Sequence, residues 1–340
     1  MKFKFRLKSL DTAVVAAIIG FIIMGIALLY WAFRANDIVV TNDAKENKPV
    51  SALTGLPCDN ATRRPIAVML ASDPEARPLS GIGQADMVFE MPVTPNGITR
   101  MMAVYQCGEP TEIGSIRSAR QDFIPLAQGL DAILAHWGGE KDALDALNNH
   151  IIDNIDALKY ESSTFYRKKG VPRPHNGFTS PELLWKRASD LVYRASTSMP
   201  AYPHTDKAPG DAFVVSSEDI IIDWPQRMNV RFVYDPTTKT YARWRGGTRE
   251  IDADTGAQVR VATVIVMETD ASFLRDQYIT VRTTGTGTAT LWQQGRTTSA
   301  VWKKQSDTAM LTFTDSKGTP IPLSVGSSWI IVDAPLPTTR

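Results

Sequence analysis

The sequence predicts a mixed α+β (α/β) domain followed by a β-rich domain, with a single transmembrane helix before both. Three observations support this fold class. An uncharged apolar run occupies residues 13–33, short apolar runs alternate with helix-like segments over 52–195, and strand-like runs separated by turn residues fill 212–334. A chain of 340 residues has room for two domains of ordinary size. The proline-containing segment 196–211 is the predicted linker between them.

The run 13–33 is long enough to cross a bilayer, because a helix of that length rises about 30 Å. Tyr30 and Trp31 stand at its end, as in an interfacial aromatic belt. Residues 1–12 are basic, so the positive-inside rule predicts a cytoplasmic N-terminus and extracytoplasmic domains. A cleaved signal peptide is the alternative, but it has a shorter apolar region and a small-residue cleavage site. We therefore expect a single-pass signal anchor in the cell membrane, followed by a polar tether at 34–51.

Three short apolar runs open the first domain and predict strands at 66–70, 85–93 and 98–106. Cys58 precedes the first of them and Cys107 follows the third. If these strands are antiparallel neighbours, the two cysteines lie at one edge, and an extracytoplasmic location permits a disulfide. Two separate thiols are the alternative.

Two charged residues flank the turn between the second and third strands. Glu90 and Arg100 stand at similar distances from Pro95-Asn96-Gly97, so a hairpin brings them near one another. A solvated cross-strand ion pair is the plain interpretation, and participation in a ligand site is the other.

The stretch 113–139 carries the strongest indication of a site. Ser118 predicts an N-cap for a helix that begins at Ala119, with Arg120 in its first turn. Helix N-termini attract anions, and Arg117 and Arg120 would add bidentate donors for a carboxylate or phosphate. Ordinary surface salt bridges are the alternative for both arginines.

The end of this stretch is a predicted strand, 132–137, followed by Gly138-Gly139 and a helix-like segment. Such a backbone lets a ligand approach closely, although it matches neither a Walker motif nor GxGxxG. His136 stands at the turn and is either a catalytic or ligand-orienting residue or a hydrogen-bonded core histidine. A polar loop over 165–178 brings Arg173, His175 and Asn176, residue types that suit a site.

Composition excludes several classes of function. The net charge of +1 gives no electrostatic basis for a nucleic-acid partner. Two cysteines without a CxxC exclude ribbon or finger zinc sites, and we expect neither a metal nor a cofactor.

The second domain reads as strand after strand, including a hairpin formed by 231–235 and 240–245. A sandwich or half-open barrel fits this pattern. Its tryptophans at 244, 292, 302 and 329 suggest either core packing or stacking against carbohydrate.

Six motifs together resemble those of the YerB-like bacterial cell-envelope proteins, a family of unknown function. They are ARP (76–78), ADMVFE, NGITR, IGSIRSAR, DAILAHWGG and RPHN, in this order. Asn96 replaces a glycine common in the family, and Glu140 stands where the family often has serine. The resemblance implies a two-domain extracytoplasmic protein and no particular activity. The polar motif positions of the family correspond here to Glu90, Arg100, Arg117, Ser118, Arg120, His136, Arg173, His175 and Asn176.

These observations predict a membrane-anchored binding protein that holds an anionic small molecule or envelope glycan in an Arg/His-lined cleft. The arginines would hold the anion, while Gly138, Gly139 and the histidines would shape the site. A hydrolase or phosphoryl-transfer enzyme with His136 or His175 as general acid or base is one alternative. A scaffold in a membrane assembly is the other. Convergence of the arginines and histidines in space separates the first two from the third.

Overall fold

The computed structural model describes residues 24–25 and 48–337, apart from 209, 211, 226 and 276. The predicted cytoplasmic segment 1–12, nearly all of the predicted transmembrane segment 13–33 and most of the tether lie outside the described residues. Within the described residues, the structure has no helix with the length and apolar character that a bilayer crossing requires.

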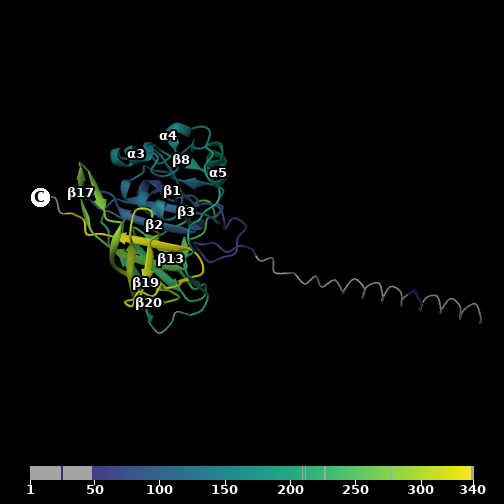
Figure 1. Cartoon of the computed structure of the whole chain (residues 1–340), viewed down its shortest axis with the longest axis vertical. Coiled ribbons are helices and arrows are strands. Elements are labelled where there is room, and N and C mark those ends of the chain that lie inside the picture. The colour runs from purple at the N-terminus through teal and green to yellow at the C-terminus, as the bar shows by residue number, and fades with distance from the viewer. Residues whose placement is uncertain are drawn as a thin grey trace, which may run out of the picture. The chain divides into compact units, whose positions relative to one another are not determined.

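A single eleven-stranded sheet contains strands from both halves of the sequence (Figure 1). The two halves meet where β2 pairs with β23 in parallel, from Met87 opposite Ser328 to Glu90 opposite Ile331. In spatial order the strands are β10 (Val214–Val215), β20 (Arg296–Lys304), β19 (Gly285–Gln293), β16 (Thr263–Glu268), β23 (Ser328–Asp333), β2 (Met87–Pro92), β3 (Thr99–Tyr105), β1 (Ile66–Ala71), β5 (Ile133–His136) and β6 (Asn154–Asp156), with β21 (Thr312–Thr314) beside β20.

Both faces of this sheet are covered, which explains why its central strands are continuous apolar runs. Along β1, Ala67 and Met69 belong to one core, whereas Ile66, Val68 and Leu70 belong to the other. The predicted first three strands are confirmed as β1, β2 and β3. The predicted domain boundaries stay a prediction, since strands of both halves share the sheet and its two cores.

The directions of the strands place several of their carboxyl ends at the same edge of the large sheet. β1 is parallel to β5, and β5 is parallel to β6. β1 and β2 are each antiparallel to β3, so β1, β2, β5 and β6 all run the same way. Their carboxyl ends therefore meet at a single edge of the sheet, where ligands bind in many open α/β sheets.

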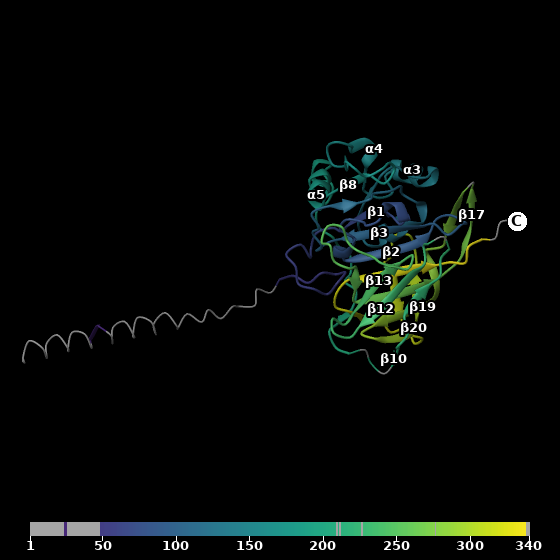
Figure 2. The ribbon, with the colours of Figure 1, turned by 180° about the vertical axis from the view of Figure 1, so that it is seen from behind.

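The helices are short and lie in the first half. They are α2 (Ile124–Gly129), α3 (Lys141–Asn148), α4 (Ala157–Tyr160) and α5 (Pro181–Asp190), with 3-10 turns η1 (Pro74–Ala76), η2 (Ile82–Gln84) and η3 (Gln121–Phe123). Figures 1 and 2 show α3, α4 and α5 beyond β1, at the opposite end from β20. The N-cap of α5 is Ser180, whose hydroxyl accepts from Leu183 N at 3.3 Å. The hydroxyl of the preceding residue, Thr179, donates to the Thr164 carbonyl at 2.7 Å.

A five-stranded sheet packs on one face of the large sheet. It contains β11 (Ile220–Ile222), β12 (Val230–Asp235), β13 (Thr240–Arg245), β14 (Thr248–Arg249) and β15 (Arg260–Val261). The predicted hairpin is confirmed, with Val230 opposite Arg245 and Asp235 opposite Thr240. Phe232 meets Trp329 edge to face at 6.0 Å. Trp302 and Trp329 are fully buried, which favours core packing over carbohydrate stacking for this pair.

Three small sheets complete the described fold. They are the pairs β17 (Ala271–Arg275) with β18 (Tyr278–Val281) and β9 (His204–Thr205) with β22 (Leu323–Ser324), and a set formed by β4 (Ile113–Gly114), β8 (Gly177–Thr179) and β7 (Tyr166–Arg167).

The structure confirms the disulfide between Cys58 and Cys107, whose Cα atoms are 6.0 Å apart. It ties the segment before β1 to the end of β3.

Replacing both cysteines by alanine should lower the free energy of unfolding, because the bridge joins positions 49 residues apart. The chain-entropy relation gives about 4 kcal/mol as an upper figure, and typical losses are about 2–4 kcal/mol. Urea unfolding of the oxidised protein and the double variant measures the difference. An unchanged urea concentration at the unfolding midpoint, together with an unchanged dependence of the free energy on urea, would contradict a stabilising role of the disulfide.

Candidate anion-binding site

A group of charged side chains gathers where β1 ends, at the carboxyl edge of the large sheet. β1 leads directly into Asp73, and β3 places Arg100 opposite Ala71. Arg117 reaches the same place because its backbone N–H donates to the Met69 carbonyl at 2.9 Å. Three segments that are distant in sequence thus bring their charged side chains together.

Asp73 is the carboxylate at the centre of this group. Its Oδ2 lies 3.5 Å from Arg100 Nη1 and 3.7 Å from Arg117 Nη2. Burial, followed by the positive charge of Arg120, lowers the pKa of Arg100 to about 9. Two guanidinium groups therefore share this carboxylate, and the third, that of Arg120, lies close enough to repel Arg100.

Arg120 lies at the rim of this group, beneath the β17–β18 hairpin. Its Nη1 donates to the Ala119 carbonyl at 2.9 Å, and its guanidinium carbon lies 4.9 Å from the centre of the Tyr278 ring. Burial lowers the pKa of Arg120, and the neighbouring Tyr278 and Glu140 partly offset this effect. The hairpin thus fixes the arginine by stacking, and the Arg120 Nε has no hydrogen-bond partner within the described residues.

Several buried donors in this group have no acceptor. Within the described residues, no hydrogen bond reaches Nε of Arg100, Arg117 or Arg120. The neighbour of Arg100 Nη1 is Asp73 Oδ2 at 3.5 Å, and this oxygen likewise accepts no hydrogen bond among these residues. A buried polar group without a partner costs about 1–3 kcal/mol, and such groups are rare in folded proteins. Unused guanidinium donors beside one another are what an incoming oxyanion requires.

His175 belongs to the same group. It is 9% exposed, and its Nδ1 is buried without a hydrogen-bond partner among the described residues. Burial, followed by the charge of Arg117, lowers its pKa below the ordinary value of 6.5. We name Asp73, Arg100, Arg117, Arg120 and His175 together the arginine cluster.

The backbone around the cluster differs from the prediction. The prediction of a helix that begins at Ala119 is wrong, because the backbone of Arg120 is extended and η3 begins only at Gln121. Ala119 N donates to the Gly138 carbonyl at 2.9 Å, and Trp137 N donates to the Arg117 carbonyl at 3.0 Å. These bonds hold the loop flat against the end of β5, so Ser118 caps no helix.

Glu140 is the N-cap of α3, and its carboxylate also reaches the start of η3. Its carboxylate accepts from Asp142 N and Ala143 N at the start of α3, and also from Gln121 N. Gly138 has φ +62°, a conformation that favours glycine. A Cβ on Gly139 would lie 3.1 Å from the Leu144 side chain. The two glycines therefore serve close packing of this loop.

His136 lies outside the cluster, in the core. It is 1% exposed, with Nδ1 2.8 Å from the Gly138 carbonyl and Nε2 3.2 Å from Asn154 Oδ1. Both ring nitrogens are engaged, which leaves neither to exchange a proton with a substrate. The structural interpretation of this histidine is therefore the better one.

Among the described residues, neither Arg173 nor Asn176 makes a hydrogen bond or ion pair with a member of the cluster, so their part in the site stays a prediction. Arg173 is exposed. Asn176 Oδ1 accepts from Arg167 Nη1 at 3.0 Å, and Arg167 stacks on Trp137 at 4.1 Å. Asn176 thus supports an aromatic contact next to the site.

Glu90 is a core residue, and the predicted pair with Arg100 is wrong. The register places Glu90 opposite Met101 and Arg100 opposite Met91, so the two side chains point to opposite faces of the sheet. Glu90 is fully buried and pairs with Arg243 Nη2 at 2.6 Å and with Arg245 Nη1. Thr99 and Trp329 also donate to its carboxylate.

Sequence reasoning missed Asp73, Arg243 and Arg245. The two arginines alternate along the run TYARWR, a period that places both on one face of a strand. Two arginines on an otherwise apolar strand face require a buried carboxylate as their partner. The alternation of arginines in TYARWR could therefore have predicted a buried ion pair. Asp73 follows a predicted strand directly, in a loop rich in turn residues.

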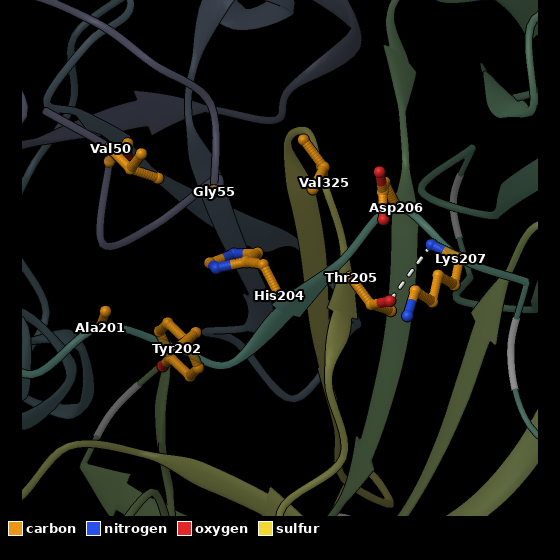
Figure 3. Close-up of a pocket in the computed structure, with 10 residues that line it drawn as sticks. Val50, Gly55, Ala201, Tyr202, His204, Thr205, Asp206, Lys207 and Val325 are labelled. Atoms are coloured by element: carbon orange, nitrogen blue, oxygen red, sulfur yellow. Dashed lines mark hydrogen bonds between the residues drawn. The ribbon is translucent and has the colours of Figure 1, made fainter. Parts of the chain in front are cut away.

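A cavity of about 750 Å³ lies elsewhere, between the segment 50–55 and the β9–β22 pair (Figure 3). Its His204 Nε2 is 3.1 Å from the Leu53 carbonyl, and its Thr205 hydroxyl accepts from Lys207 N. Asp206 and Lys207 are exposed and opposite in charge. No group of three metal-ligating side chains was found in the described part of the chain. The arginine cluster is therefore the better candidate.

Comparisons with known proteins agree with this fold. Residues 53–194 match the family model described as "Protein of unknown function (DUF3048) N-terminal domain", and residues 220–330 match the corresponding C-terminal domain. The chain belongs to this YerB-like family of unknown function.

One relative is the protein named "Putative lipoprotein YerB" from Bacillus subtilis (strain 168). It is 29% identical over 299 residues, which cover 86% of this chain and 87% of the relative. The crystal structure of YerB from the same organism matches with a TM-score of 0.77 and 27% identity, over 85% of this chain and 98% of that one.

Replacing Glu90 by glutamine should strongly destabilise the protein, because two fully buried arginines would lose their counter-charge. Breaking a buried pair costs about 3–5 kcal/mol. Glu161→Gln is the matched control, since the Glu161 carboxylate pairs with Arg167 near the surface and should contribute under about 1 kcal/mol. Urea unfolding measures both. Similar small losses in the two variants would refute the core role of Glu90.

Proposed function

We propose that this protein is a membrane-anchored, extracytoplasmic binding protein that holds an anionic cell-envelope ligand at the arginine cluster. The observation that carries the proposal is the set of buried guanidinium nitrogens around Asp73 that have no hydrogen-bond acceptor within the described residues. Charge-assisted hydrogen bonds to an oxyanion would satisfy these donors and balance the excess positive charge.

Anchoring through residues 13–33 fits the chemistry of the cysteines. The Bacillus subtilis relative carries the name "Putative lipoprotein YerB". The two cysteines of this sequence are joined to each other, so neither is available for a lipid. The apolar segment 13–33 would anchor this chain instead, with the basic residues 1–12 in the cytoplasm. A disulfide also suits an oxidising extracytoplasmic compartment.

The ligand class follows from the donors. Guanidinium groups present planar pairs of N–H donors that match carboxylate, phosphate and sulfate oxygens. In the cell envelope, a phosphorylated glycan, a peptidoglycan carboxylate or a nucleotide-like headgroup carries such groups. Binding through Arg100, Arg117 and Arg120 would leave the uncharged part of the ligand toward solvent.

The enzymatic alternative depends on His175, because His136 has no free ring nitrogen. A general base must reach a nucleophile or a water at hydrogen-bond distance. Within the described residues, no hydroxyl contacts His175 Nδ1. Binding is therefore the function we favour over hydrolysis or phosphoryl transfer. A scaffold with a purely structural cluster predicts no anion binding at all.

Replacing Arg117 by glutamine should weaken the binding of sulfate and of N-acetylglucosamine 1-phosphate by about 10-fold or more. One charge-assisted hydrogen bond is worth about 1.5–3 kcal/mol. Calorimetric titration of the full-length chain measures the dissociation constants. Arg260→Gln is the matched control, since this arginine pairs with Asp235 of β12 and should leave binding unchanged. Equal affinities for the wild type, Arg117→Gln and Arg120→Gln would contradict the proposal that these arginines bind an anion.

Sulfate binding should strengthen as the pH falls from 7 to 5. His175 is neutral at pH 7 because its pKa is lowered, and it gains a positive charge within the cluster as the pH drops through that value. Sulfate keeps its charge over this range, so titrations at several pH values isolate the protein's contribution. The His175→Gln variant should lose the pH dependence. An unaltered dependence in this variant would assign the effect to another group.

A further inference from the structure

A second set of arginines lines a cavity of about 400 Å³ next to the five-stranded sheet. Its walls come from residues 77–79 and from the segment 245–251, on β13, β14 and the turn between them. Leu79 is fully buried, and Pro78 and Ile251 complete an apolar lining. Arg77, Arg245 and Arg249 bring positive charge to these walls, against the single carboxylate of Glu250.

The acidic groups at this cavity are already engaged by buried arginines. Glu250 pairs with Arg243, which is fully buried. Glu90, behind the cavity, pairs with both Arg243 and Arg245. The positive charges of Arg77 and Arg249 are therefore not balanced by Glu90 or Glu250. In agreement, burial and the charge of Arg245 lower the pKa of Arg77 to about 10.

Two of the lining arginines also have unused donors. Nε of Arg77 and Nε of Arg245 are buried and lack a hydrogen-bond partner among the residues that the structure describes. The other nitrogens hold the side chains in place, because Arg77 Nη2 donates to the Ser72 carbonyl at 2.7 Å and Arg245 Nη2 donates to Thr99 Oγ1 at 2.6 Å.

We propose that this cavity binds a monocarboxylate with an apolar body. The volume lies within the range of small-molecule sites, which combine apolar walls with a few fixed polar groups. The guanidinium groups of Arg77 and Arg249 would receive the carboxylate, while Leu79 and Ile251 would cover the hydrocarbon. The site uses none of the residues of the arginine cluster, so it stands independently of the proposed function.

The test compares 4-methylpentanoate with its neutral amide, by calorimetry on the full-length chain in nanodiscs with empty nanodiscs subtracted. The carboxylate should bind at least 10-fold more tightly than the amide. Arg77→Gln should remove this preference, and Ile251→Trp should abolish binding by filling the cavity. Arg231→Gln is the control, because Arg231 pairs with Asp219 and stacks on Trp244, outside the cavity.

Two further arms define the ligand and separate the sites. N-acetyl-leucine binding more tightly than 4-methylpentanoate would indicate an acylated amino acid, and the reverse would indicate a simple branched acid. Excess sulfate, which tests the arginine cluster, should leave carboxylate binding unchanged. Equal affinity for acid and amide, absence of binding at millimolar concentration, or wild-type affinity in both variants would overturn the proposal.

Discussion

The buried carboxylate of Glu90 is the constraint on which the two halves of the chain depend. It lies on β2 of the first half, and its partners Arg243 and Arg245 lie on β13 of the second. A lone charge at such depth is strongly unfavourable, so each half supplies what the other needs. The neighbouring β2–β23 pairing adds backbone hydrogen bonds across the same junction. The five-stranded sheet is thereby held against the large sheet.

This arrangement leaves the opposite face of β3 free for a different use. Arg100 points there because it neighbours Met101, which lies on the Glu90 side. Its counter-charge is Asp73 alone, and two further arginines share that carboxylate or lie close to it. The contrast between the two sites is informative. At Glu90 the carboxylate is saturated by donors, whereas at Asp73 the donors exceed the acceptors. The first site has the properties of a core element, and the second those of a binding site.

Much of this fold was accessible from sequence periodicity. Strands β1, β2 and β3, the β12–β13 hairpin and the disulfide were predicted from short apolar runs, turn residues and cysteine positions. Arg100, Arg117, Arg120 and His175 were predicted to converge and do so, because residues that follow buried strands collect at one edge of a sheet. The ligand itself stays a prediction.

The failures have specific causes. The helix at Ala119 was expected from local capping chemistry, but backbone pairing with the loop after β5 replaced it. Glu90 was assigned to the site because register was judged from distance along a hairpin, and a shift of one residue moves a side chain to the other face. Its true partners are more than 150 positions away in the sequence. His136 was grouped with the site by residue type, which carries no information on direction, whereas the assignment of Arg173 and Asn176 stays a prediction.

The most direct test of the anion site is a crystal structure of the full-length chain with tungstate, located by its anomalous signal. The donors of Arg100 and Arg117 should hold the ion, with its oxygens about 2.7–3.2 Å from their Nε atoms. Ordered waters on those nitrogens, together with tungstate bound only elsewhere, would contradict the assignment of this cluster as an anion site.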